Sequence, residues 1–259
     1  MIQKDLTICP LASGSKGNSL FVSWEENAIL IDAGLSGIEI ERRMKAKNQS
    51  PENLTAILVT HEHSDHIRGV GVLSRRYNIP VYMSNDTYKK AASNLGKLAD
   101  LKTFNCGQSF HIDNMEVSPF TISHDAIDPA GFTLSCNNKK LGIATDLGIA
   151  TNLVKEYLKD CFLLYLEANH DPDMLINGPY PWYLKQRIKS NQGHLSNVDT
   201  KELLEELNNE NLKHVILAHL SEENNTPEKA FNAAKQGLNS SNVEIEVAMP
   251  HKPGKLITL

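Results

Sequence analysis

Several features are scarce or missing in this sequence, and each absence narrows what the protein can be. The 259-residue chain has no apolar run near the roughly 20 residues that span a bilayer, and no hydrophobic signal segment near its start. Its four cysteines, Cys9, Cys106, Cys136 and Cys161, are widely spaced and form no Cys-x-x-Cys pair. Free, mostly buried thiols are therefore favoured over disulfides or a thiolate zinc site. We expect a cytoplasmic protein that has no membrane partner.

An excess of basic residues is also missing. The chain has 26 Lys and Arg against 31 Asp and Glu, which gives a formal net charge of −5. Nucleic-acid-binding proteins usually have a cluster of Lys and Arg on one face, so the negative net charge counts against a polynucleotide substrate. Bound divalent cations would add positive charge that the count omits, so such a substrate stays open.

Two familiar motifs are absent as well. The turn at residues 13–19 contains no Gly-Lys-Ser or Gly-Lys-Thr, so it is not a phosphate-binding Walker A loop. The residue four positions after His61 is Asp65, so the helical His-Glu-x-x-His zinc motif is not formed.

The pattern of apolar residues predicts an α/β protein. With 41% hydrophobic residues in 259, the chain can bury a sizeable core, and no linker or repeat divides it, so we expect one domain over residues 1–259. Strands are predicted at 6–12, 19–24, 28–32, 57–59, 80–83, 115–123, 141–145, 161–168, 215–218 and 243–247. Helices are predicted at 36–48, 67–77, 86–95, 180–191, from about 193 onward, and at 227–238.

The most informative stretch follows the apolar run at 57–59. His61, His63, Asp65 and His66 fall within six residues. A single histidine at a strand end is usually a solvated or capping residue, but no core buries four such groups without partners. In extended chain, His61 and His63 point to the same side, while Asp65 and His66 lie where the next helix should begin. One turn can therefore serve two metal ions.

This stretch resembles the His-x-His-x-Asp-His signature of the metallo-β-lactamase fold superfamily. Within it, the whole chain is similar to the small single-domain YycJ/WalJ (VicX) type, described as an exonuclease-like metallohydrolase. The resemblance implies a four-layer αββα sandwich, in which two mixed sheets are flanked by helices.

The resemblance also implies a full set of metal ligands. Apolar runs end at His124, Asp146 and His219, which alone would be unremarkable but which match the family's remaining metal motifs. We assign His61, His63 and His124 to one ion, Asp65, His66 and His219 to the other, and Asp146 as the bridge. Asp65 is also expected to have a catalytic role. Asp32 is expected to hold the loop that contains the His61 cluster without binding a metal itself.

The predicted chemistry is hydrolysis. Nitrogen and oxygen ligands without sulfur suit two divalent ions, zinc or manganese, with iron also possible. Ions about 3.5–4 Å apart can share a water and turn it into a bridging hydroxide nucleophile. Glu167 and His194 resemble the Glu and His motifs of transfer-RNA 3′-processing endonucleases, where the pair is thought to protonate the leaving oxygen. The sequence leaves open whether these two residues are neighbours.

Substrate contacts are the least specific prediction. Ser15 and Asn18 lie in a turn that can form an anion nest or an ordinary hairpin, and the resemblance favours substrate contact. Ser196 and Asn197, which follow His194, are the other expected contacts. Lys185, Arg187 and Lys189 form a basic helix face that can be solvated or can meet a phosphate. His170 has no assigned role.

Three functions are compatible with these residues. The favoured one is a dinuclear phosphodiester hydrolase, a 5′→3′ DNA exonuclease that uses the hydroxide as nucleophile and Glu167 with His194 as proton donor. The alternative is a thioester hydrolase of glyoxalase II type, which the acidic net charge supports and the Glu167/His194 pair does not. The third is a regulatory or scaffolding protein with a structural metal site.

Overall fold

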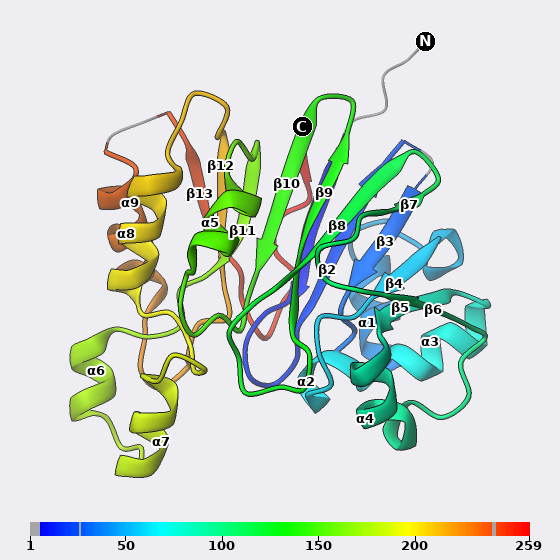
Figure 1. Ribbon diagram of the computed structural model, residues 1–259, viewed down its shortest axis with the longest axis horizontal. Helices are drawn as coiled ribbons and strands as arrows, with labels where there is room; N and C mark the ends of the chain where they lie inside the picture. The colour runs from blue at the N-terminus through cyan, green and yellow to red at the C-terminus, as the bar shows by residue number, and fades with distance from the viewer. Residues whose placement is uncertain (1–5, 26, 240–241) are drawn as a thin grey trace. The chain divides into compact units, whose positions relative to one another are not determined.

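Two mixed β-sheets and their helices make up the chain in the computed structural model, which describes residues 6–25, 27–239 and 242–259 (Figure 1). The chain folds into two compact units. The first contains residues up to Val117 together with 126–128 and 249–259, and the second contains 118–125 and 129–248. The predicted α/β class with two mixed sheets and flanking helices is confirmed, whereas the one-domain organisation stays a prediction.

The first unit contains a sheet of order β14-β1-β2-β3-β4-β5-β6. Its neighbours are antiparallel from β14 to β3 and parallel from β3 to β6. The strands are β1 (Thr7–Ala12), β2 (Ser19–Trp24), β3 (Asn27–Ile31), β4 (Ala56–Leu58), β5 (Pro80–Ser84), β6 (Asp100–Phe104) and β14 (Ile257–Thr258). β3 and β4 are buried along their whole length, as strands with helices packed beside them should be.

Side-chain caps determine where the helices of the first unit begin. Ser36 and Ser84 accept the Glu39 and Thr87 amides and so start α1 and α4. Apolar residues of these helices and of the sheet form one buried cluster that includes Ile40, Leu73 and Ala91. The helices are α1 (Gly37–Lys45), the short 3-10 helix η1 (Pro51–Asn53), α2 (Ser64–Ile67), α3 (Val70–Tyr77) and α4 (Asn85–Leu95).

The helix predicted at 67–77 is α3, which begins only at Val70, and a separate short helix, α2, ends at Ile67 on the other side of Gly69. The Gly69 amide donates to the Ala33 carbonyl at 2.7 Å, so the chain is tied there to the loop after β3. A Cβ at Gly69 would lie 2.5 Å from the Leu35 carbonyl oxygen. This close backbone contact ends the first helix, and apolar periodicity does not reveal it.

The second unit contains the strands from β8 to β13, which belong to a sheet of order β13-β12-β11-β10-β9-β8-β7. β10 to β13 are mutually parallel, and β9 is antiparallel to β10. β7 and the beginning of β8 belong to the first unit. The strands are β7 (Phe110–Ile112), β8 (Met115–Thr121), β9 (Ala130–Cys136), β10 (Lys139–Ala144), β11 (Leu163–Glu167), β12 (His214–Ala218) and β13 (Glu244–Val247).

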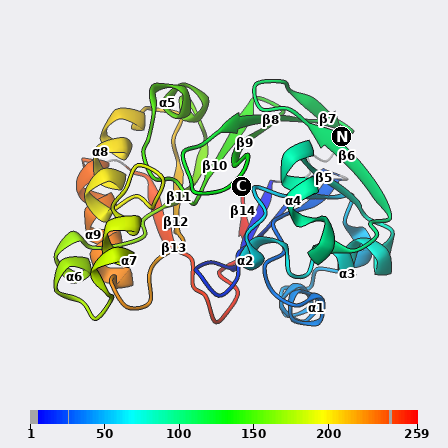
Figure 2. The ribbon, with the colours of Figure 1, turned by 60° about the horizontal axis from the view of Figure 1, so that its bottom comes forward.

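In the second unit, α8 and α9 pack against each other beside β13 (Figure 2). Ser196 caps α8 in a reciprocal capping box with Asp199, and Thr226 caps α9 before Pro227. The predicted helix at 180–191 is shorter because Pro181 precedes its first turn. The helices are α5 (Asn152–Leu158), α6 (Pro172–Asn177), α7 (Trp182–Ile188), α8 (Asn197–Leu207) and α9 (Pro227–Gly237).

Three predicted site residues lie just past strand ends in the left-handed backbone region. The φ angle is +59° at Asp32 after β3, +58° at Asp146 after β10 and +55° at His219 after β12. This region costs non-glycine residues about 1 kcal/mol or more, so these turns are held by their surroundings.

The four cysteines are thiols that are mostly buried, as predicted: Cys9, Cys136 and Cys161 are buried, and Cys106 is half-buried. Burial raises the pKa of the Cys161 thiol to about 12. Among the described residues, no helix combines the length and the apolar character that crossing a membrane requires.

Candidate metal and catalytic site

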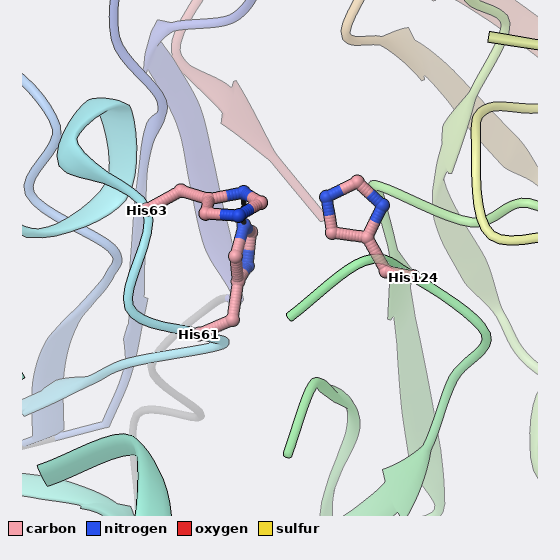
Figure 3. Close-up of side chains that lie close together, drawn as sticks. All are labelled: His61, His63 and His124. Atoms are coloured by element: carbon pink, nitrogen blue, oxygen red, sulfur yellow. Dashed lines mark hydrogen bonds between the residues drawn. The ribbon is translucent and has the colours of Figure 1, made fainter. Parts of the chain in front are cut away.

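The first unit brings its four predicted ligands together in the turn between β4 and α2. His61 and His63 lie on the connecting segment, and Asp65 and His66 lie in the first turns of α2. His61 Nε2 is 3.0 Å from His63 Nδ1, and Figure 3 shows these two rings turned toward each other. Two nitrogens on one tetrahedral zinc ion would be about 3.3 Å apart, given Zn–N distances of about 2.0–2.1 Å. The pair therefore has the spacing of two ligands of one ion.

Asp32 is the anchor of this cluster. Its Oδ1 accepts the Thr60 amide at 2.9 Å, and its Oδ2 accepts the Thr60 hydroxyl at 2.8 Å. Oδ2 also lies 2.7 Å from His66 Nδ1. A carboxylate on one ring nitrogen fixes the ring and directs the other nitrogen outward, an arrangement common behind metal-binding histidines. His66 Nε2 accordingly lies 3.6 Å from Asp65 Oδ2, its neighbouring candidate ligand.

Thr60 is a functional residue that the sequence reasoning missed. Its hydroxyl lies 2.9 Å from His61 Nδ1 and 3.3 Å from His66 Nδ1, while it donates to Asp32. It therefore connects the Asp32 carboxylate to His61 as well as to His66. The sequence feature that could have identified Thr60 is its position directly before His61.

In the second unit, Asp146, Glu167, His194 and His219 bring ligand-type atoms within 4.8 Å of one another. Asp146 Oδ1 is 3.5 Å from His219 Nε2 and 3.7 Å from His124 Nε2. These separations also suit ligands of a common ion. Three segments that are distant in sequence, the ends of β8, β10 and β12, thus supply a second group of nitrogen and oxygen donors.

Glu167 occupies the centre of this second group and is fully buried at the end of β11. Its Oε1 lies 2.8 Å from both His194 Nδ1 and His219 Nδ1, and its Oε2 accepts the Leu147 amide at 2.5 Å. Burial alone would raise the pKa of Glu167, but the neighbouring histidine charges and hydrogen bonds together outweigh it and lower that pKa. The group is therefore an ionised carboxylate that orients two imidazoles.

His124 follows β8 and is almost completely buried; Figure 3 shows its ring on that segment. Its Nδ1 lies 3.3 Å from the Gly193 carbonyl oxygen. Burial lowers the pKa of His124, despite the opposing effect of the Asp146 charge. The neutral imidazole that results is the form that binds a metal ion.

The predicted substrate residues lie in two separate places. In the first unit, Ser15 is exposed, while Asn18 is buried, accepts the Gly14 amide at 2.8 Å and donates to Asp65 Oδ2 at 3.3 Å. In the second unit, Ser196 caps α8, and the side chain of Asn197 donates to Asn225 Oδ1 at 2.8 Å. Ser15 and Ser196 line cavities, and the two asparagines hold loops together.

Two of the three cations of the basic helix face have partners within the protein. Lys185 Nζ donates to the carbonyls of Ile176 and Gly178, both at 2.7 Å, and Arg187 pairs with Asp125 at 2.6 Å. Lys189 instead lines a cavity that also borders His194. This face is therefore mainly structural, with Lys189 as its exception.

The donor atoms of both clusters fit a divalent metal. They are imidazole nitrogens and carboxylate oxygens, buried or half-buried, and each cluster has a carboxylate behind its histidines. The sequence predicts the other members of these clusters as ligands and Glu167 with His194 as a proton-donating pair, but it does not predict the contact of Glu167 with His219.

Comparison with known proteins identifies the family. Residues 27–220 match the model of the beta-lactamase superfamily domain. The chain is also 40% identical over 230 residues to exodeoxyribonuclease YycJ of Bacillus anthracis, an alignment that covers 88% of this chain and 87% of that protein. This chain belongs to the metallo-β-lactamase superfamily.

Further relatives and a solved structure extend the comparison. Exodeoxyribonuclease WalJ of Streptococcus pneumoniae is 39% identical over 224 residues, 85% of this chain and 83% of that protein. The hydroxyacylglutathione hydrolase of Hamiltonella defensa is 36% identical over only 108 residues, 41% of each chain. The metallo-β-lactamase fold protein YhfI of Bacillus subtilis has a TM-score of 0.75 at 15% identity, over 97% of this chain and 99% of that one, which supports the fold.

The superfamily assignment and the fold therefore confirm the resemblance predicted from the His61 stretch. The relatives that match most of the chain are named as exodeoxyribonucleases, in agreement with the predicted hydrolase class. The glyoxalase II type matches less than half of the chain.

Proposed function

We propose that this protein is a metal-dependent exodeoxyribonuclease that hydrolyses phosphodiester bonds in DNA from the 5′ end. Membership of the metallo-β-lactamase superfamily supports the hydrolase class, and the two curated relatives above support DNA as the substrate. The 5′→3′ direction rests on the resemblance described from the sequence.

The observation that carries the proposal is the 2.8 Å contact between Glu167 Oε1 and His194 Nδ1. Glu167 is completely buried, whereas the His194 side chain keeps 15% of its surface exposed. A carboxylate bonded to Nδ1 fixes the imidazole ring and leaves its other nitrogen to donate a proton to a leaving group. An alkoxide leaving from a phosphodiester needs such a donor, and a thiolate leaving from a thioester does not.

We assign the two metal positions as the sequence predicts. His61, His63 and His124 would hold one ion, Asp65, His66 and His219 would hold the other, and Asp146 would be a ligand shared by both. When bound, divalent ions supply a hydrolytic nucleophile from water at neutral pH and neutralise phosphate charge. Asp32 contacts Nδ1 of His66, and Glu167 contacts Nδ1 of His219, so each carboxylate fixes the ring of one ligand histidine. The side-chain amide of Asn18 donates to Asp65 and fixes that carboxylate.

The reaction adds one water molecule across a P–O3′ bond. The water oxygen forms a bond to phosphorus while one of its protons passes to Asp65. The P–O3′ bond breaks, and the proton on His194 goes to O3′, so the released terminal nucleotide has a 3′ hydroxyl and the shortened strand has a 5′ phosphate. Proton exchange with solvent then restores Asp65 and His194.

The thioester hydrolase is the second candidate and remains testable beside the first. Its support is the partial match to hydroxyacylglutathione hydrolase and the net charge of −5. The Glu167/His194 pair argues against it, because a thiolate leaves without being protonated and therefore needs no proton donor.

The deciding experiment is a matrix of metals and substrates. Full-length protein loaded with zinc, manganese or iron is incubated with single-stranded DNA labelled at either end, with RNA, with bis-p-nitrophenyl phosphate and with a hydroxyacylglutathione thioester. We expect mononucleotide release from the 5′ end of DNA and slower hydrolysis of the small diester. Thioester hydrolysis with intact DNA would overturn the proposal, and an absence of both activities would favour the scaffolding protein.

A further inference from the structure

A cavity of about 550 Å³ in the second unit borders His194. His170 and Ser196 line it, from the segments that follow β11 and precede α8. Ile149 and Val198 also line it and are 41% and 49% exposed. The volume lies within the roughly 300–1,000 Å³ of pockets that take one small-molecule ligand.

His170 is the unexplained residue of this cavity. Its backbone is fixed, because its carbonyl accepts the Asn197 amide at 2.8 Å, and only 3% of its surface is exposed. Burial lowers the pKa of His170 to about 4, so the ring is neutral at pH 7. Within the part of the chain that the structure describes, its Nδ1 has no hydrogen-bond partner.

An unpaired polar atom at that depth needs a reason. A buried donor or acceptor without a partner costs about 1–3 kcal/mol, so nearly all such atoms are satisfied in native proteins. His170 lines the cavity although its Nδ1 is itself covered, so a small turn of the ring is needed to present this nitrogen to a ligand hydroxyl or ring nitrogen. This observation points to a polar, uncharged ligand group.

The charges around the cavity limit which ligand fits. Three carboxylates, Asp199, Glu202 and Glu206, face two ammonium groups, Lys155 and Lys189. Lys155 is already paired with Glu206 at 2.7 Å, so a run of phosphates would meet net repulsion there. The apolar surface of Ile149 and Val198 instead suits the flat face of a nucleobase.

We propose that this cavity receives the nucleoside whose 3′ oxygen leaves during hydrolysis, with its base against Ile149 and Val198 and a polar group bonded to His170. This inference rests on the proposed nuclease function. The proton donor must reach the leaving oxygen, and His194 lines this cavity, so the nucleoside attached to that oxygen lies on the same side. A cavity of this volume has room for one nucleoside, in agreement with the proposed release of single nucleotides from a strand end.

The test is to fill the cavity from its exposed edge. Val198→Trp and Ile149→Trp place an indole at partly exposed positions that line it, and Ile38→Trp, on the exposed face of α1, is the matched control. Binding of 2-aminopurine deoxyriboside to full-length protein is followed by its fluorescence, and circular dichroism with thermal melting verifies that each variant is folded.

We expect the wild type and Ile38→Trp to bind the nucleoside, and at least one of the two cavity variants to bind it at least tenfold more weakly. The ratio of DNA cleavage to bis-p-nitrophenyl phosphate hydrolysis should fall at least tenfold in the same variant. Equal nucleoside binding by both folded cavity variants and the wild type would overturn the proposal, as would no binding by the wild type.

Different results would contradict the nuclease function and the nucleoside site. If wild-type protein cleaves neither DNA nor the small diester, the nuclease function itself fails. If it cleaves DNA and the folded cavity variants cleave it equally well, the nuclease function stands and the nucleoside site is wrong.

Discussion

His219 Nδ1 lies 2.8 Å from Oε1 of Glu167, the same oxygen that lies 2.8 Å from His194 Nδ1. One carboxylate oxygen thus orients a proposed metal ligand and a proposed proton donor. The geometry of the two histidines is linked through Glu167, and a change at this residue should affect both metal binding and proton transfer.

The first prediction concerns that link. Glu167→Gln should lower metal affinity about 10- to 100-fold, because the partner that fixes the His219 ring is altered. DNA cleavage should fall further than in any variant of His194 alone. Metal content per chain after gel filtration, measured by elemental analysis, checks this result. Glu205→Gln, at an exposed glutamate of α8, is the control and should keep its metal. Full metal content in Glu167→Gln would contradict the shared role.

The second prediction separates proton donation from metal binding. His194→Ala should cleave DNA about 10²- to 10⁴-fold more slowly, the usual contribution of a general acid. Hydrolysis of bis-p-nitrophenyl phosphate should fall much less, because p-nitrophenolate leaves without a proton. Initial rates on both substrates measure the difference, and His111→Ala, at an exposed histidine outside the site, is the control. Equal losses on the two substrates would remove His194 from the donor role.

The third prediction concerns the first unit. Asp32→Ala leaves the Thr60 amide and hydroxyl and His66 Nδ1 without their acceptor, so unfolding free energy should fall by about 1–3 kcal/mol. Metal affinity should drop about 10- to 100-fold, since the His66 ring loses its anchor. Urea denaturation and metal titration check both effects. Thr60→Val, which removes only the hydroxyl, should show smaller changes of each kind. An Asp32→Ala protein as stable and as metal-loaded as the wild type would refute the anchoring role.

The fourth prediction is a pH dependence of stability at α1. Hydrogen bonding to Arg42, assisted by Arg43, lowers the pKa of Glu39 to about 2 from 4.5, although burial opposes the shift. Because the folded-state pKa is the lower one, this contribution is present above about pH 4.5 and is lost as the pH falls toward 2. Glu39→Gln should therefore destabilise the protein by about 1 kcal/mol at pH 7.

The same variant should approach the wild type in stability below pH 3. Thermal melting at pH 7, 4, 3 and 2 measures this convergence. Glu156→Gln, at an exposed glutamate of α5, should show no such pH-dependent difference. A Glu39→Gln deficit that stays constant down to pH 3 would show that the ion pairs are not its cause.

Much of this architecture could be predicted from the sequence. The apolar runs at 19–24 and 80–83 are strands β2 and β5, and His61 follows its strand as expected, because strand patterning and ligand-type residues at strand ends are local signals. Several elements were missed, most of them short or polar. β6, with Asp100 and Lys102 among its residues, is largely exposed, so its apolar pattern is weak. α5, α6, β7, β9 and β14 were also not predicted.

What the sequence could not provide were contacts between distant segments. The helix predicted at 67–77 begins only after Gly69, because the Gly69 amide bonds to the loop after β3, and no local pattern contains that information. The side chain of Asn197, expected near substrate, donates instead to Asn225, 28 positions away. Similarly, the contact between Glu167 and His219 joins the ends of two neighbouring strands, and only the strand order reveals it.

The left-handed turns at Asp32, Asp146 and His219 have a consequence for evolution in the laboratory. Glycine adopts this backbone without penalty, yet it has no carboxylate or imidazole. A library selected only for heat resistance should therefore admit glycine or asparagine at Asp146 and His219, whereas a library selected for turnover should reject both. These two positions would distinguish selection for a durable scaffold from selection for a working enzyme.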